Sequence, residues 1–387
     1  MNVTLLSICQ ALVMSGASLH IILGGLAGHA LADDKALATL PITLTVVGSL
    51  TATVPASLLM QKIGRRGGFL IGTSIGLAGA LLACLALWWY DFWLFVLASG
   101  LGGAANGFAQ YYRFAAADAE PPERRARAIS WVLSGGIAAA FLGPGLASRT
   151  AELFLPYTFL GGYVALVILQ IGCGLLLCFL RLPPLVVPAH EAVGRPLGEI
   201  VKNPTFLLAL AGAMTGYAVM SLLMTATPLA MQGCGFGLGD SSFVIQWHVL
   251  AMFGPSFFTG RLIGRFGAPV IMLVGMVCHG IAALTAIAGI DFGNFLIALI
   301  ALGLGWNFSF IGGTALVTTC HRPVERGKVQ AVNDLVVFGG VATASALSGV
   351  LLHHFDWTTV NLVALPFIGL VGVGLIWLAL KRPQGAA

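Results

Sequence analysis

Residues 57–67 read SLLMQKIGRRG, a short basic turn between two long apolar runs. The same pattern returns in GRLIGRFGAPV at residues 260–270, where Gly267 aligns with Gly64. A second pair of similar segments, PPERRARAISWVLSGG at 121–136 and PVERGKVQAVNDLVVFGG at 323–340, is separated by nearly the same offset. These paired segments indicate that the chain consists of two related halves.

The composition requires a membrane. Of the 387 residues, 58% are hydrophobic and only 9% are charged, which excludes a water-soluble globule. Apolar runs of about 20 residues must be helices in lipid, because each segment has to satisfy its own backbone hydrogen bonds. We therefore predict an all-α membrane protein with twelve transmembrane helices, near 5–30, 36–60, 68–89, 92–115, 128–149, 156–181, 204–231, 241–263, 268–290, 294–319, 329–353 and 358–381.

Lysine and arginine predict the orientation. With the N-terminus inside, only Lys35 and Arg149 fall in outer loops, and the other loop cations fall on the inner side. Cytoplasmic loops are enriched in these residues, so we expect both termini in the cytoplasm. The net charge of +5 follows from this bias, and we predict lipid and no nucleic acid as a partner.

A linker separates the two halves. Residues 181–204 read RLPPLVVPAHEAVGRPLGEIVKNP, and their prolines and charges are typical of a loop outside the membrane. We expect an N-terminal six-helix half at 1–181, a cytoplasmic linker at 182–203 and a C-terminal six-helix half at 204–387.

This parallel repeat of six helices, with a basic turn after the second and eighth, resembles the major facilitator superfamily. The resemblance implies a transporter rather than an enzyme, with no prosthetic group and with two halves that rock around a central site. The residues that correspond to the superfamily's inner-loop motif are Gln61, Lys62, Gly64, Arg65 and Arg66, and Arg265 and Gly267 in the second copy. Both copies lack the usual aspartate, but Asp118 is available to pair with Arg65 or Arg66 in a gating contact.

Two pairs of potential metal ligands stand four residues apart. Met220 and Met224 precede a turn near residue 236, and His248 and Met252 follow it at matching depths. Residues four apart share one helix face, and thioethers suit Cu(I). Methionine also fills gaps in apolar packing, and Met272 and Met276, beside His279, repeat the same spacing, so the spacing alone leaves both interpretations open.

The two motifs together are similar to those of the CcoA-like branch of the superfamily. That resemblance implies import of copper, as Cu(I), across the bacterial cytoplasmic membrane for cbb3-type cytochrome oxidase biogenesis. It implies Met220, Met224, His248 and Met252 as ligands, periplasmic copper donors and cytoplasmic copper acceptors as partners, and a monomer. Cys234 and Met231 are candidates for the entry path, and His20 is a candidate for proton exchange.

Other interpretations remain open. Polar and aromatic residues of the fourth and tenth spans would suit an organic substrate: Asn106, Gln110, Tyr111, Tyr112, Trp306 and Asn307. The segment AFLGPGLA at 140–147 resembles the Gly-Pro motif of proton-coupled antiporters of the superfamily, so export of a small organic compound is the main alternative. A haem-binding sensor that uses His20 and His248 is a third class. No aspartate or glutamate lies deep in a predicted span.

Overall fold

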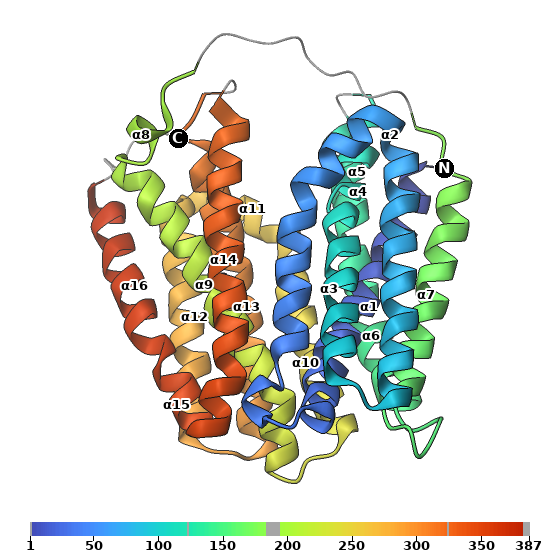
Figure 1. The fold of residues 1–387 in the computed structure, drawn as a ribbon. Helices are drawn as coiled ribbons and strands as arrows, with labels where there is room; N and C mark the ends of the chain where they lie inside the picture. Colours follow the sequence, from blue (N-terminus) through green and yellow to red (C-terminus); the bar gives the residue numbers. More distant parts are fainter. Residues whose placement is uncertain (1, 122–123, 183–193, 323–324, 382–387) are drawn as a thin grey trace. The chain divides into compact units, whose positions relative to one another are not determined.

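The computed structural model describes residues 2–121, 124–182, 194–322 and 325–381, and every regular element among them is a helix (Figure 1). Residues 183–193 of the predicted linker lie outside the described residues. The chain divides into two compact units, one comprising Met1–Val187 and Met231–Gln246 and the other comprising Pro188–Ala230 and Trp247–Ala387. The half boundaries at 181 and 204 stay a prediction.

The helices of the first unit run from the N-terminus to the linker. They are α1 (Asn2–Leu31), the short 3₁₀ helix η1 (Lys35–Leu37), α2 (Leu40–Trp89), α3 (Phe92–Ala109), α4 (Tyr112–Asp118), α5 (Arg125–Leu133), α6 (Gly135–Thr150) and α7 (Leu160–Cys178).

The remaining helices begin with α8, inside the predicted linker, and the unit boundary crosses two of them, α9 and α10. They are α8 (Leu197–Ile200), α9 (Pro204–Gly233), α10 (Leu238–Phe253), α11 (Ser256–Phe266), α12 (Ala268–Ala288), α13 (Phe292–Thr318), α14 (Arg326–His354), α15 (Trp357–Leu362) and α16 (Ala364–Lys381).

Ten helical stretches among the described residues are long and apolar enough to cross a membrane. The difference from the predicted twelve arises at two places. The second and third predicted spans are continuous in α2, although Gly64 inside it has a non-helical backbone with φ 81° and ψ 161°. The eighth span is divided between α10 and α11 before Pro255, because proline lacks the N–H that would continue the helix. The orientation of the termini stays a prediction.

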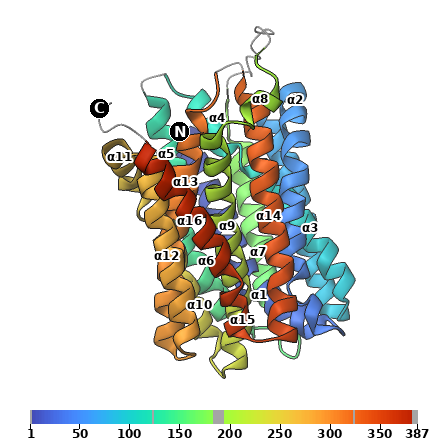
Figure 2. The same ribbon diagram turned by 90° about the vertical axis from the view of Figure 1, so that its left-hand side faces the viewer.

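Small residues allow the helices to approach closely. A Cβ atom on Gly103 of α3 would lie 2.0 Å from the carbonyl oxygen of Thr45 in α2, so only glycine fits there. Close approach at small residues is how helices associate in lipid, where no hydrophobic effect drives them together. In the other unit, α12 packs against α13 and α16, and Figure 2 shows α16 in dark red beside α12.

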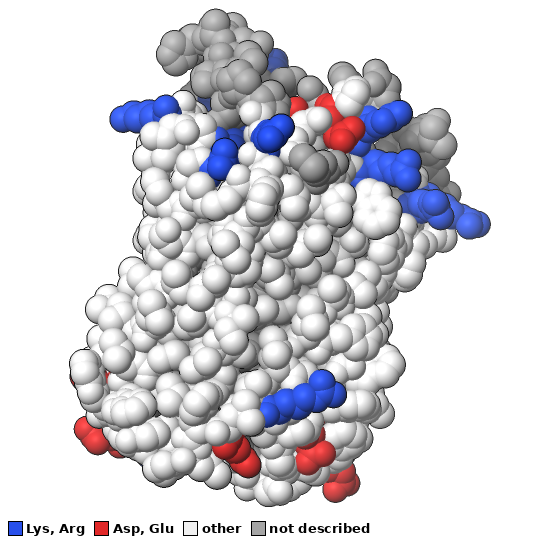
Figure 3. Space-filling model, turned by 90° about the vertical axis from the view of Figure 1, so that its right-hand side faces the viewer, with Lys and Arg blue, Asp and Glu red and all other residues white. Residues whose placement is uncertain are grey.

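The outer surface is that of a protein solvated by lipid. Large apolar side chains are widely exposed, including Trp93 of α3 at 64%, and Leu370 and Leu380 of α16 at 75% and 82%. On the face drawn in Figure 3, charged side chains lie toward the two ends and an uncharged band lies between them. Exposed leucines on this scale would be a liability in water, but they suit a hydrocarbon environment.

Candidate functional site

The four proposed copper ligands lie on α9 and α10 and are all buried. Met220, Met224, His248 and Met252 are 2%, 6%, 0% and 7% exposed. The Nδ1 of His248 lies 2.7 Å from the carbonyl oxygen of Leu299, so this nitrogen donates a hydrogen bond that ties α10 to α13. No group of three or more His, Cys, Asp or Glu residues that could hold a metal occurs among the described residues.

The other methionine and cysteine candidates have separate surroundings. Met231 is fully buried at the end of α9, whereas Cys234 is exposed in the following turn. Met272 of α12 is also fully buried, and its methyl group occupies the space beside Gly212 of α9. Its role is therefore to fill a gap between helices, as methionine commonly does.

The basic turn in α2 makes two contacts at the end of its unit. Arg65 donates a hydrogen bond to Asp118 of α4, the pairing that the sequence suggested, and Arg66 donates one of 2.7 Å to the carbonyl oxygen of Cys178. Gln61 and Lys62 are exposed, as is Arg265 in the second copy. The gating role of this turn stays a prediction.

Five aromatic rings meet in the second unit. Tyr217 of α9 makes edge-to-face contacts with Trp306 and Phe310 of α13 and with Phe338 of α14, at centroid distances of 5.5, 5.2 and 5.7 Å. Trp306 stacks on Phe310 at 5.2 Å and lies 5.8 Å from Phe253 of α10. We call these five residues the aromatic cluster.

One polar atom in the aromatic cluster is unpaired. Trp306 is 7% exposed, and its Nε1 is buried without a hydrogen-bond partner in the described part of the chain. A buried N–H without an acceptor costs about 1–3 kcal/mol, so such a group is a candidate for binding a ligand. Asn307, the next polar candidate of the same span, already has hydrogen-bond partners: its Nδ2 donates to the carbonyl of Met252 and to Ser256 Oγ.

A small polar cavity lies in the first unit. It is lined by His20 of α1, Thr45 of α2, Asn106 of α3, and Tyr163 and Gln170 of α7, with glycine and alanine filling most of the remaining wall. Its volume of about 40 Å³ accommodates water but not an organic substrate. The sequence suggested His20 and Asn106, and it missed the other three because nothing in their local pattern marks them.

The remaining polar candidates of the fourth span support the fold. The hydroxyl of Tyr111 donates to the carbonyl oxygen of Thr53 at 3.0 Å. The Tyr112 hydroxyl lies 3.5 Å from the sulfur of Cys173, beside Phe69. Gln110 is exposed. These residues connect helices of the first unit and leave the aromatic cluster as the better candidate for an organic ligand.

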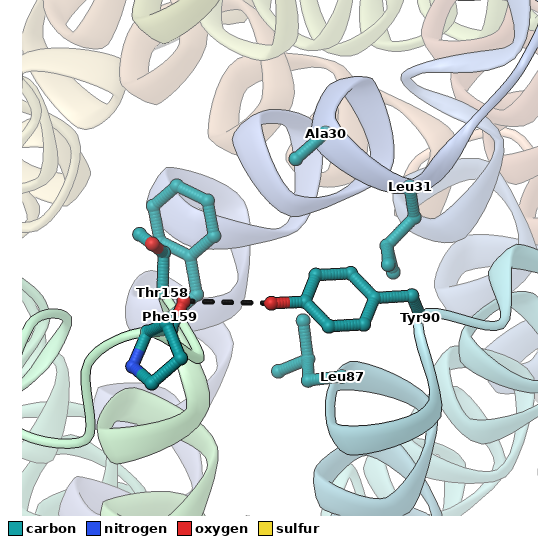
Figure 4. Close-up of a pocket in the computed structure, with 7 residues that line it drawn as sticks. Ala30, Leu31, Leu87, Tyr90, Thr158 and Phe159 are labelled. Carbon is teal, nitrogen blue, oxygen red and sulfur yellow. Dashed lines mark hydrogen bonds between the residues drawn. The ribbon is translucent and has the colours of Figure 1, made fainter.

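A larger cavity of about 190 Å³ opens where the loops of the first unit meet (Figure 4). Ala30, Leu31, Leu87 and Phe159 make its wall largely apolar, and the hydroxyl of Tyr90 donates a hydrogen bond of 3.5 Å to the carbonyl oxygen of Pro156 across it. Among the residues that the structure describes, no charged side chain lines this cavity, and its polar groups do not converge on a point as they do in a specific ligand site.

The comparisons with known proteins agree on the class of molecule. The family described as Major Facilitator Superfamily matches residues 6–284 and 247–387. The riboflavin transporter RfnT of Brucella anthropi is 44% identical over 388 residues, covering 100% of this chain and 97% of the relative. The uncharacterised transporter YddS of Bacillus subtilis, of the same superfamily, is 31% identical, with 90% and 84% covered. A crystal structure of the nucleoside transporter NupG has a TM-score of 0.74 at 15% identity, with 99% and 100% covered, and so shares the fold.

These findings overturn the predicted copper import and the resemblance to the CcoA-like branch. The relative that matches the whole chain at 44% identity is named for riboflavin, an organic molecule. Without copper as the substrate, nothing supports the predicted copper donors, the copper acceptors or a role in oxidase biogenesis. The physical reason is that spacing of four residues also arises from packing: the three methionines lie in apolar interiors, and His248 bonds to a backbone carbonyl.

Proposed function

Because this chain belongs to the major facilitator superfamily, it is a transporter and not an enzyme, and we propose that it carries riboflavin or a closely related flavin across the bacterial cytoplasmic membrane. The whole-length identity of 44% to a riboflavin transporter carries this proposal. The fold alone would not, because one fold serves many substrates. We further propose that transport proceeds by alternating access of the two halves.

The aromatic cluster supports a flavin as the substrate. The isoalloxazine ring of riboflavin is planar, heteroaromatic and uncharged, and aromatic side chains bind such rings by stacked or edge-to-face contacts. Tyr217 is half-buried at the centre of the cluster, and we propose its ring as the platform for the substrate. The Trp306 Nε1 supplies a hydrogen-bond donor for a ring carbonyl of the flavin.

The absence of charge in the aromatic cluster fits the same substrate. Its members are one tyrosine, one tryptophan and three phenylalanines. A neutral ring system enters such a site without an ion pair, whereas a phosphorylated flavin would bring charge that the cluster does not balance. We therefore expect riboflavin to be preferred over flavin mononucleotide.

Uptake by intact cells tests the proposal. A bacterial strain that lacks its own riboflavin uptake should accumulate radiolabelled riboflavin in a saturable manner when it expresses this chain. The same strain with an empty vector should not. Unlabelled riboflavin should compete better than flavin mononucleotide, and copper should not compete. Absence of riboflavin transport in either direction, in cells that contain the protein in their membranes, would reject the proposal.

Export of an organic compound, rather than its import, remains the second candidate for the direction of transport. The Gly-Pro segment that suggested it has a structural explanation, since a Cβ on Gly143 of α6 would lie 2.6 Å from the Cβ of Ser18 in α1. This glycine is thus required by the close contact of α1 with α6 whatever the direction. Release of preloaded riboflavin from everted and right-side-out vesicles distinguishes the two directions.

A further inference from the structure

The polar cavity of the first unit surrounds a histidine whose two ring nitrogens are both engaged. His20 is 8% exposed; its Nδ1 lies 2.8 Å from the hydroxyl of Tyr163, and its Nε2 lies 3.1 Å from the Oγ1 of Thr45. Three helices, α1, α2 and α7, thus meet at one titratable ring. A buried ionisable group in a membrane-spanning helix is costly and is a functional candidate by default.

The neighbours of Thr45 favour one tautomer of His20. The Oγ1 of Thr45 lies 3.1 Å from the carbonyl oxygen of Pro41 and 3.1 Å from that of Ser99, and both oxygens can only accept. We assign the single hydroxyl hydrogen of Thr45 to the bond with one of these carbonyls, so that Oγ1 accepts a hydrogen bond from His20. Neutral His20 then carries its hydrogen on Nε2, and its Nδ1 accepts the O–H of Tyr163.

This arrangement leaves one place for an added proton. A second proton on the ring goes to Nδ1, where it meets the hydrogen of the Tyr163 hydroxyl. The hydroxyl then has to turn and accept from the imidazolium, and its own hydrogen needs a new acceptor. Protonation of His20 therefore reverses the hydrogen bond between α1 and α7 and moves the Tyr163 hydrogen toward the cavity.

The cavity supplies the acceptor that this reversal requires. Tyr163 lines it together with Asn106 and Gln170, whose side-chain amides can both accept and donate hydrogen bonds. Its volume of about 40 Å³ is enough for a water molecule. A water bound by these amides can accept the Tyr163 hydrogen and carry protons to and from the site.

The surroundings of His20 contain no competing charge. Tyr163 of α7 is the other titratable group in the cavity lining, and Cys84 of α2 lies close to Tyr163. The ring that faces His20 from α3 is Phe95, at 6.3 Å, and α6 presents Gly143 to Ser18 of α1. No Asp, Glu, Lys or Arg is among the described residues that line the cavity. Histidine is the side chain whose charge ordinarily changes between about pH 5 and 8.

We propose that His20, hydrogen-bonded to Tyr163 beside a cavity large enough for water, is the proton-binding site that couples transport to the transmembrane proton gradient. One proton adds to His20 Nδ1 and later leaves from the same atom, so no other reactant is needed. The test of this inference rests on the proposed flavin transport. It has two readouts, exchange of riboflavin and accumulation driven by a pH gradient, so failure of the proposed function and failure of the proton site can be told apart.

The test compares exchange with gradient-driven transport in proteoliposomes. Wild-type protein should exchange labelled for unlabelled riboflavin without a gradient and should concentrate riboflavin when a pH gradient is imposed. His20→Gln should keep exchange but concentrate no riboflavin. His353→Gln, at the exposed end of α14, is the control and should behave as wild type.

Each outcome separates the claims. Failure of the wild-type protein to exchange riboflavin rejects the proposed function. The role of His20 is overturned if the wild-type protein exchanges riboflavin but does not accumulate it in response to the pH gradient. It is also overturned if His20→Gln accumulates riboflavin as the wild type does. If His20→Gln loses exchange as well, Tyr163→Phe decides: a shifted pH dependence of exchange supports the inference, and a wild-type pH dependence overturns it.

Discussion

Gly64 and Gly267 adopt the same backbone conformation in the two halves of the chain. Their φ and ψ angles are 81° and 161° at Gly64 and 82° and 150° at Gly267. Glycine reaches this region without a steric penalty, whereas other residues do so only under strain. The two glycines that align in the basic turns thus share one backbone conformation, and in each half the chain changes direction at this residue.

Replacement of Gly64 by alanine should therefore destabilise the protein. A Cβ at this position meets no atom within 4 Å, so the loss of about 1–3 kcal/mol comes from backbone strain alone. Gly264→Ala is the matched control, because Gly264 has the same open surroundings but lies inside α11. Alanine is favoured there by up to about 1 kcal/mol. Thermal unfolding in detergent should show a lower midpoint for the first variant only, and equal midpoints would contradict the assignment.

The linker is attached to the second unit by an ion pair. Arg195 Nη2 lies 2.7 Å from Oε2 of Glu325, which is fully buried in front of α14, and Arg195 Nε and backbone N–H donate to Oε1 at 2.8 Å. The backbone N–H of Arg322 adds a fourth hydrogen bond. These donors, above all the Arg195 guanidinium, hold the pKa of Glu325 well below its usual value.

Glu325→Gln should lower stability at neutral pH, and the loss should shrink in acid. A carboxylate with a depressed folded-state pKa stabilises the fold fully above its ordinary pKa of about 4.3, and this contribution is lost as the pH falls further. Unfolding midpoints of wild type and variant should therefore converge below about pH 4.3. Glu199→Gln, at an exposed side chain of α8, should match the wild type at every pH. A difference that is independent of pH would argue against the ion pair as its cause.

Met224→Leu should leave transport intact. Met224 is 6% exposed, and exchange of methionine for leucine in a packed interior usually costs less than about 1.5 kcal/mol. Riboflavin uptake and copper content should both match those of cells with the wild-type chain. Loss of copper uptake in this variant, from a measurable wild-type level, would restore the metal interpretation.

Trp306→Phe should weaken recognition of the substrate. The change removes Nε1, whose hydrogen bond to a flavin carbonyl we expect to contribute about 0.5–1.5 kcal/mol, so KM should rise roughly twofold to tenfold. Trp93→Phe, on a side chain that is 64% exposed, is the control and should leave KM unchanged. An unaltered KM in Trp306→Phe would show that the indole N–H does not contact the substrate.

The local sequence predicted the features that depend on residues close together in the chain. Apolar run lengths predicted the long apolar helices, apart from the two places where the count differs. Asp118, predicted to pair with Arg65 or Arg66, does pair with Arg65. The breaks were harder to locate. Pro255 divides a predicted span, whereas Pro55 lies within α2, so proline alone does not say where a helix ends.

The substrate site could not be read in the same way. The contact of Tyr217 with Phe338 joins two helices that are far apart in the sequence, and no spacing rule connects them. The methionine pairs illustrate the opposite problem. Their spacing is regular because a helix face is regular, whether the side chains bind an ion or fill a gap.

Riboflavin transport by the purified protein is the most direct test of the account. Proteoliposomes that contain only this chain should take up labelled riboflavin in a saturable manner, and excess unlabelled riboflavin should abolish the uptake. Protein-free liposomes should remain at background. Folded, reconstituted protein that leaves riboflavin uptake at the protein-free background would contradict the central claim.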